Sequence, residues 1–268
     1  MAFLESLHVY PVKSCGGIAL DDARLTPTGL AHDREWVLVD PKDQFLTQRD
    51  EPRLALLRTR LTPQVLEMQA PGREPLTVPL DHDGERRIVT IWRSQNPAFD
   101  AGDAAAAWLG DFLGRPVRLM RFDTTHRRLS SRDYTREIEA PNLFTDGYPI
   151  MVLSRASVDD LNRRVGRTFD TNRFRPNLVI DGVDAYAEDT LHEIDAGDVT
   201  LRLVKRCTRC VITTTDQETG ERDGDEPLRT LRSYRFDAAL RGIVFGVNAV
   251  IVRGEGGRLR RGQPIAVR

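Results

Sequence analysis

The sequence is poor in cysteine and has no long apolar run. Its 268 residues include three cysteines, too few for the disulfide framework that stabilises small secreted domains. No stretch approaches the roughly 18 consecutive apolar residues of a membrane-spanning helix. The first 17 residues contain Glu5 and His8 and lack the basic segment and apolar core of a signal peptide. From these absences we expect a cytoplasmic protein with reduced thiols and no membrane association.

The chain also lacks a strong charge of either sign. Its formal net charge is −1, which gives no support for a nucleic acid or an anionic membrane as a partner. Hydrophobic residues make up 40% of the sequence, which is enough for a substantial core. The length suits one large domain or two modest ones. We therefore expect a globular protein that does not bind nucleic acid.

Short strand-like segments dominate the chain, and helical patterns are few. One helix is predicted at 102–114 with Asp103 as its cap, and another at 154–165 with Ser154 as its cap. The polar stretch 123–136 is typical of a connection or surface loop. Strands follow one another without helices between them, which favours an α+β or barrel architecture over a doubly wound sheet. The predicted strands lie at 7–9, 36–39, 54–57, 88–92, 177–181, 199–205, 211–215, 243–252 and 264–267.

The sharpest local feature is the C-x-x-C motif of Cys207 and Cys210. In a thioredoxin-like redox pair the second half of this motif lies in a helix. Here the five β-branched residues 211–215 follow Cys210 and favour a strand. A zinc site needs about four ligands, and Cys15 and the scattered histidines form no H-x₃₋₅-H pair to complete one. Both interpretations are disfavoured, and two partly buried structural thiols remain an alternative.

Basic residues surround the two thiols, namely Lys205, Arg206 and Arg209. Nearby cations stabilise a thiolate relative to a thiol, and a thiolate is the soft ligand that a transition metal requires. The same cations would neutralise an anionic ligand beside the sulfur. The pattern indicates a candidate metal–thiolate site, although a solvated strand end would carry similar charges.

Two other segments could bind an anion. Residues 10–17 (YPVKSCGG) place a lysine and a serine before two flexible glycines, without the spacing of a P-loop. Residues 172–177 (NRFRPN) place arginines, which can bind phosphate in a bidentate manner, at the start of an apolar strand. The chain has no G-x-S-x-G elbow, no complete dinucleotide-binding glycine motif and too few cysteines for a ferredoxin cluster.

Taken in order, these motifs resemble those of the MOSC-domain proteins. The resemblance is to the branch with a preceding MOSC N-terminal domain, which contains the mitochondrial amidoxime-reducing component and its bacterial relatives. It spans nearly the whole chain. The motifs that carry it are YPVKSC (10–15), HDREW (32–36), QRDEPRL (48–54), NRFRPNLVIDG (172–182), AYAED (185–189), CTRCVITTTDQETG (207–220), EPLRTLRSYR (226–235) and FGVN (245–248).

The resemblance implies a cofactor and the residues that contact it. The cofactor is molybdenum held by molybdopterin (the molybdenum cofactor), with Cys210 as the protein ligand to the metal and Cys207 as a structural thiol. Lys13, Ser14 and Arg34 match positions that grip the phosphate or the ring of the pterin. Other cofactor contacts match Thr145, Asp146, Arg175, Asn177, Thr208, Arg209 and Asn248.

The resemblance also implies a fold and an activity. The fold is α+β, with a β-rich N-terminal domain (1–120) and a MOSC β-barrel domain with peripheral helices (121–268). The implied activity is two-electron reduction of a small N-hydroxylated or N-oxide substrate. Because this sequence lacks a fused ferredoxin domain, we expect electrons from a separate protein of ferredoxin or flavoprotein type. The alternative is a non-catalytic protein that carries molybdenum cofactor or sulfur.

Overall fold

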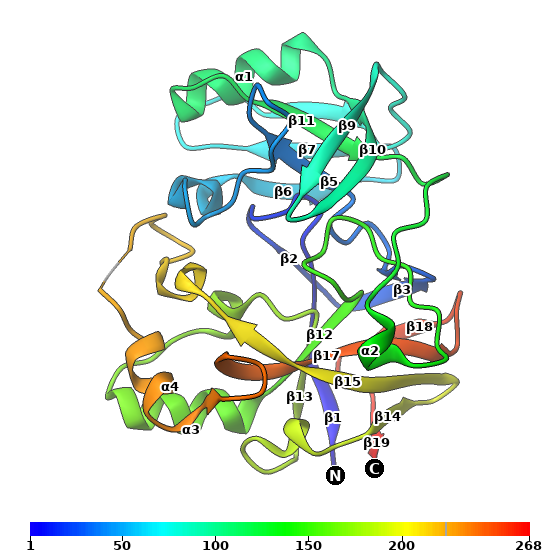
Figure 1. The fold of residues 1–268 in the computed structure, drawn as a ribbon, viewed down its shortest axis with the longest axis vertical. Coiled ribbons are helices and arrows are strands. Elements are labelled where there is room, and N and C mark those ends of the chain that lie inside the picture. Colours follow the sequence, from blue (N-terminus) through cyan, green and yellow to red (C-terminus); the bar gives the residue numbers. More distant parts are fainter. Residues whose placement is uncertain (223) are drawn as a thin grey trace.

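The computed structural model describes residues 1–222 and 224–268 and has two lobes (Figure 1). The lower lobe in that view is built on one large sheet, and the upper lobe holds helix α1 above smaller sheets. The predicted α+β class is confirmed. Within the described residues, no helix is both long and apolar enough to cross a membrane.

The large sheet has nine strands. Their order is β19-β14-β15-β17-β12-β13-β1-β2, and β16 pairs with β17. Strands β12 and β13 run parallel and are joined by helix α3, whereas the other pairs are antiparallel. The strands are β1 (Phe3–Val9), β2 (Ile18–Leu20), β12 (Ile150–Ser154), β13 (Leu178–Asp181), β14 (Glu193–Ala196), β15 (Val199–Arg209), β16 (Phe236–Asp237), β17 (Gly242–Arg253) and β19 (Ala266–Val267).

Backbone hydrogen bonds join β1, next to the last strand in this order, to the segment that precedes β19, the first strand. Leu4 N–H donates to the carbonyl of Gln263 at 2.9 Å, and Gly262 N–H donates to the carbonyl of Leu4 at 2.7 Å. The segment that pairs with β1 in this way leads directly into β19, at the opposite end of the strand order. The sheet therefore closes into a barrel, and buried apolar side chains such as Leu7, Val152 and Leu201 form its core.

The upper lobe is made of two smaller sheets. Strands β5, β11, β10 and β9 form one, and strands β6, β7 and β8 form another. Buried Trp36, Leu38 and Leu109 belong to one apolar cluster that joins α1 to these strands. The third small sheet, β18-β3-β4, lies beside the large sheet of the lower lobe (Figure 1), and its buried Leu25 and Leu259 belong to the barrel core. The strands are β3 (Asp22–Thr26), β4 (Gly29–Leu30), β5 (Trp36–Val39), β6 (Arg58–Leu61), β7 (Val65–Gln69), β8 (Leu76–Pro79), β9 (Arg86–Ile91), β10 (Ser94–Asp100), β11 (Arg118–Phe122) and β18 (Arg258–Arg260).

The helices lie at the edges of the sheets. Both predicted helices are present, but neither is capped by the side chain expected: Gly102 is the N-cap of α1, and Ser154 occupies the N-cap of α3 without a side-chain bond. Buried Glu188 instead accepts from the Ser154 N–H at 3.2 Å. The helices are α1 (Asp103–Leu113), α2 (Arg132–Thr135), α3 (Arg155–Val165) and α4 (Leu228–Tyr234), with the 3₁₀ turns η1 (Pro52–Leu56), η2 (Thr171–Phe174), η3 (Ala187–Asp189) and η4 (Val211–Thr214).

Two strand predictions are wrong, at 54–57 and 211–215. The first segment lies mostly in η1, which has a proline at its start. In the second, the Thr213 hydroxyl donates to the carbonyl of Cys210 at 3.0 Å, and the Thr214 hydroxyl donates to the carbonyl of Val211 at 2.8 Å. These local bonds satisfy carbonyl groups in a 3₁₀ turn, so the β-branched residues do not require a strand there.

Candidate functional site

The C-x-x-C motif lies at the end of β15, the second-longest strand of the barrel wall. Strand β15 carries Cys207, Thr208 and Arg209, and Cys210 follows as the N-cap of η4. The pairing of β15 with β17 changes register between Arg206 and Thr208. Because a register irregularity alters which face a side chain takes, this end of the strand departs from simple alternation.

Hydrogen bonds to backbone carbonyls hold Arg209 in place. Its Nε donates to the Phe245 carbonyl at 2.8 Å, and its Nη1 donates to the Phe174 carbonyl at 3.0 Å. Asn248 donates to the carbonyl of Lys205 at 3.2 Å. These bonds tie the end of β15 to β17 and to η2, so the motif is fixed from two sides.

The basic residues around the motif do not act on every thiol in the same way. Burial raises the pKa of Cys207, and Arg209 and Lys205 oppose that shift without overcoming it. Arg206 pairs with the carboxylate of Asp237. The expectation that these cations favour a thiolate is therefore wrong for Cys207, because desolvation outweighs the nearby charges.

A stacked arrangement of Arg34, Tyr10 and Arg175 forms another part of the site. The guanidinium carbons of Arg34 and Arg175 lie 4.2 Å and 4.3 Å from the centre of the buried Tyr10 ring. The Tyr10 hydroxyl donates to the carbonyl of Pro176 at 3.1 Å. Arg34 also donates to Asn177 Oδ1 at 3.1 Å. Cation–π contacts and hydrogen bonds thus hold two cations near each other.

Arg175 carries a buried charge that is incompletely satisfied. Its Nη1 donates to the Cys15 carbonyl at 2.6 Å, whereas its Nη2 is buried without a hydrogen-bond partner. Burial lowers the pKa of this guanidinium to about 10. A buried cation with an unsatisfied donor is energetically unfavourable until an acceptor reaches it. This part of the site is therefore suited to an anionic ligand.

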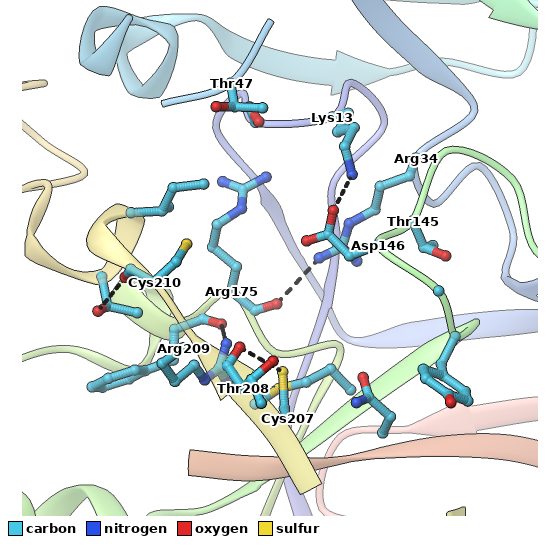
Figure 2. Close-up of a pocket in the computed structure, with 18 of the residues that line it drawn as sticks. Lys13, Arg34, Thr47, Thr145, Asp146, Arg175, Cys207, Thr208, Arg209 and Cys210 are labelled. Atoms are coloured by element: carbon cyan, nitrogen blue, oxygen red, sulfur yellow. Dashed lines mark hydrogen bonds and ion pairs between the residues drawn. The ribbon is translucent and has the colours of Figure 1, made fainter. Parts of the chain in front are cut away.

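An ion pair between Lys13 and Asp146 forms the opposite side of the site. Lys13 Nζ lies 2.7 Å from Asp146 Oδ1 and also donates to the Phe144 carbonyl at 2.8 Å. Burial lowers the pKa of Lys13, and Asp146 opposes that shift. Partial desolvation at the cavity wall would raise the pKa of Asp146, but the charge and hydrogen bond of Lys13 hold it below its ordinary value. Figure 2 shows Arg175 between this pair and Cys210.

All the residues predicted from the resemblance line one cavity of about 340 Å³. Three of them, Ser14, Arg34 and Arg175, have φ values of 66°, 49° and 56°. Backbone strain of this kind concentrates at binding and catalytic sites. The cavity therefore brings together segments that are far apart in the sequence. The predicted residues that line it are Lys13, Ser14, Arg34, Thr145, Asp146, Arg175, Asn177, Thr208, Arg209, Cys210 and Asn248.

Further residues line this cavity that were not predicted as cofactor contacts. Arg49 and Arg173 lie within motifs that carry the family resemblance, so a signal for them was present. Trp92 and Tyr148 lie outside those motifs, and no sequence signal marks them. The additional residues are Thr47, Arg49, Trp92, Gly147, Tyr148, Met151, Arg173, Phe174, Lys205, Arg206, Cys207, Ile212 and Thr213.

Asp216 stabilises the loop that follows Cys210. Its carboxylate accepts from the backbone N–H groups of Glu218 and Thr219 at 2.9 and 3.0 Å, and it pairs with the buried Arg173 at 3.0 Å. Asp216 thus both starts the turn and braces it against η2. Among the described residues, no three His, Cys, Asp or Glu side chains cluster closely enough to hold a metal ion.

Comparison with known proteins identifies this class of fold and site. Residues 1–116 match the model of the MOSC N-terminal beta barrel domain, and residues 139–266 match the MOSC domain. The chain belongs to the MOSC-domain family, in the branch that contains the mitochondrial amidoxime-reducing components. The boundary near residue 120 stays a prediction.

The chain is similar over most of its length to proteins of that branch. It is 36% identical to mitochondrial amidoxime-reducing component 1 of Mus musculus, over 87% of this chain and 71% of the relative. It is 34% identical to mitochondrial amidoxime reducing component 2 of Rattus norvegicus, over 98% of this chain and 82% of the relative. The solved YuaD protein of Bacillus subtilis is 12% identical, with a TM-score of 0.45, over 99% of this chain and 94% of that chain.

These relatives contradict the expected cytoplasmic location, because they are named as mitochondrial proteins. The expectation came from a low cysteine count and from the lack of a signal peptide. Cysteine usage reflects the redox conditions around a protein. It does not distinguish one reducing compartment from another, so the inference went further than the sequence allowed.

Proposed function

We propose that this protein is a molybdenum-cofactor-dependent reductase of N-hydroxylated or N-oxide compounds. One observation carries the proposal: a single cavity gathers a thiol, two stacked guanidinium groups and a buried ammonium group. The names of the relatives, which are amidoxime-reducing components, support the reaction class.

The residues present fit an anionic, metal-bearing cofactor. The unpartnered Nη2 of Arg175 and the adjacent Arg34 suit a phosphate-type group, to which arginine can donate two hydrogen bonds. Lys13 and Ser14 line the same cavity and can contribute further donors. Cys210 would be the protein ligand to the metal, as the family resemblance implies, because its thiol lines the same cavity as these cations.

In this proposal the protein binds and orients while the cofactor carries the electrons. When bound, the molybdenum cofactor supplies two-electron reduction of the substrate's N–O bond. Arg209 and Asn248 fix the end of β15, so that Cys210 keeps one position relative to the cations across the cavity. Electrons would come from a separate protein of ferredoxin or flavoprotein type.

Metal and pterin analysis of the protein from a cofactor-competent host tests the cofactor assignment. We expect about one molybdenum per chain in the wild type, a strong loss in Cys210→Ala and retention in Cys207→Ala, which changes the neighbouring thiol of the same motif. Wild-type protein that stays free of molybdenum in that host would contradict the proposal.

An activity assay separates an enzyme from a carrier. Benzamidoxime and an artificial reductant are supplied to the molybdenum-loaded protein, and benzamidine is quantified. We expect product from the wild type and from Cys207→Ala. Loaded protein that forms no benzamidine would instead support a carrier of the cofactor or of sulfur.

A further inference from the structure

Trp92 occupies a backbone position that normally belongs to glycine. Ile91 pairs with Ser94 across the hairpin of β9 and β10, so Trp92 and Arg93 form a two-residue turn. Trp92 has a φ of 56°, and Arg93 is outside the left-handed region. This is the pattern of a type II′ turn, whose first central residue is usually glycine. For a bulky residue such a conformation is unfavourable.

Contacts on several sides hold the Trp92 ring. Its Nε1 donates to Asp146 Oδ1 at 3.1 Å. The guanidinium of Arg49 lies 4.5 Å from the ring centre, and Phe45 meets the ring edge-on with centroids 4.9 Å apart. With these contacts in place Trp92 is still 47% exposed. The ring is therefore oriented by its neighbours but not buried by them.

The exposed ring lies at the candidate site. Trp92 and Arg49 line the same cavity as Cys210, and Asp146, which accepts the Trp92 hydrogen bond, is the partner of Lys13. The β9–β10 hairpin belongs to the upper lobe and β15 to the lower lobe (Figure 1), so the cavity combines the Trp92 ring of one lobe with the thiol of the other. A half-exposed tryptophan in a strained turn has no evident benefit for folding. Its position at the cavity therefore favours a role in binding a ligand.

We propose that Trp92 is a stacking platform for substrate, which favours N-hydroxylated compounds whose N–O group is attached to a flat aromatic framework. This inference rests on the proposed reductase function and adds the substrate class to it. An oriented indole can stack against a planar ring, and such aromatic pairs contribute beyond simple area burial. Arg49 on the ring and Asp146 at its nitrogen limit how the platform can rotate.

Binding of two small probes tests this platform. Benzamidoxime and acetamidoxime carry the same N-hydroxyamidine group on a phenyl ring and on a methyl group, and calorimetry on the molybdenum-loaded protein without reductant gives both Kd values. The measured quantity is the preference, Kd of acetamidoxime divided by Kd of benzamidoxime. We expect this preference to fall about two- to tenfold in Trp92→Gly.

Three further variants distinguish stacking from other roles. Trp92→Phe keeps a ring but lacks the Nε1 donor, and we expect it to retain most of the preference. Trp92→Asn tolerates the left-handed backbone and should behave like Trp92→Gly. Trp108→Phe removes the α1 tryptophan, whose Nε1 bonds the Glu74 carbonyl at 2.8 Å, and it should leave the preference unchanged.

Thermal melting supplies the readout that a purely structural role would change. Glycine suits the turn, so Trp92→Gly should melt no lower than wild type while losing the preference. A lower melting temperature with an unchanged preference would overturn the proposal. Wild-type protein that binds benzamidoxime preferentially but does not reduce it would contradict the reductase function and leave the platform standing.

Discussion

The ammonium nitrogen of Lys13 lies 2.7 Å from a carboxylate oxygen of Asp146, and the two residues come from segments far apart in the sequence. Lys13 is buried, whereas the Asp146 side chain is 67% exposed. The pair therefore meets at the boundary between protein and cavity. The strength of this ion pair depends on pH because acid can protonate the Asp146 carboxylate.

Asp146→Asn should change how stability depends on pH. The folded-state pKa of Asp146 is held below its unfolded value of 3.8, so its stabilising contribution is present above about pH 4 and is lost as the pH falls through that region. We expect Asp146→Asn to flatten the acid side of the curve of unfolding free energy against pH, measured with urea. Asp21→Asn makes the same substitution at an exposed site and controls for it. Equal acid slopes in wild type and Asp146→Asn would contradict the prediction.

Gly17→Ala should destabilise the protein through Tyr10. A Cβ at Gly17 would lie 2.4 Å from Cε1 of the Tyr10 ring, and the ring cannot shift easily because Arg34 and Arg175 flank it. Overpacking of this kind costs about 1–3 kcal/mol. Urea unfolding measures the loss. Gly147→Ala is the control, since nothing lies within 4 Å of a Cβ there, and a comparable loss in both variants would refute the steric explanation.

Gln48 and Gln217 form a reciprocal, buried amide pair between the upper lobe and the loop after Cys210. Gln48 Nε2 donates to Gln217 Oε1 at 3.1 Å, and Gln217 Nε2 donates to Gln48 Oε1 at 2.9 Å. Gln48 Nε2 also donates to the Ser14 carbonyl at 2.7 Å. Gln48→Leu leaves the Gln217 amide without this partner, and we expect a loss of about 1–3 kcal/mol in unfolding free energy.

A double-mutant cycle isolates the pair. Combining Gln48→Leu with Gln217→Leu should cost less than the sum of the two single losses, because the second substitution removes the group that the first left unsatisfied. Additive losses would show that the two amides do not stabilise each other.

Cys15 should resist modification in the native protein. It is fully buried, and burial raises the pKa of its thiol to about 12, so very little thiolate exists near pH 8. Iodoacetamide labelling followed by peptide mass spectrometry should find Cys15 unmodified before unfolding and modified afterwards. Cys210, which is partly exposed, provides the comparison within the same sample of cofactor-free protein. Labelling of Cys15 at the rate of Cys210 would contradict its burial.

Local sequence patterns were enough for many elements and failed where side-chain hydrogen bonds compete with the average propensity. The helix at 154–165 follows from its apolar spacing, and α3 is present as predicted. The β-branched residues after Cys210 predicted a strand, but threonine hydroxyl bonds to nearby carbonyls stabilise a 3₁₀ turn instead. Propensity describes an average environment, and such side-chain bonds override it.

By itself the sequence determined the α+β class, the family and the residue types of the site, because these depend on short motifs and on their order. It marked Cys210 as a candidate thiolate and Lys13, Arg34 and Arg175 as candidate cations, but it could not say that they share a cavity. That was decided by the closure of the barrel and the docking of the upper lobe, which juxtapose segments more than a hundred residues apart. The role of Trp92 could be recognised only from the tertiary structure, since the turn and the contact with Asp146 place its ring at the site.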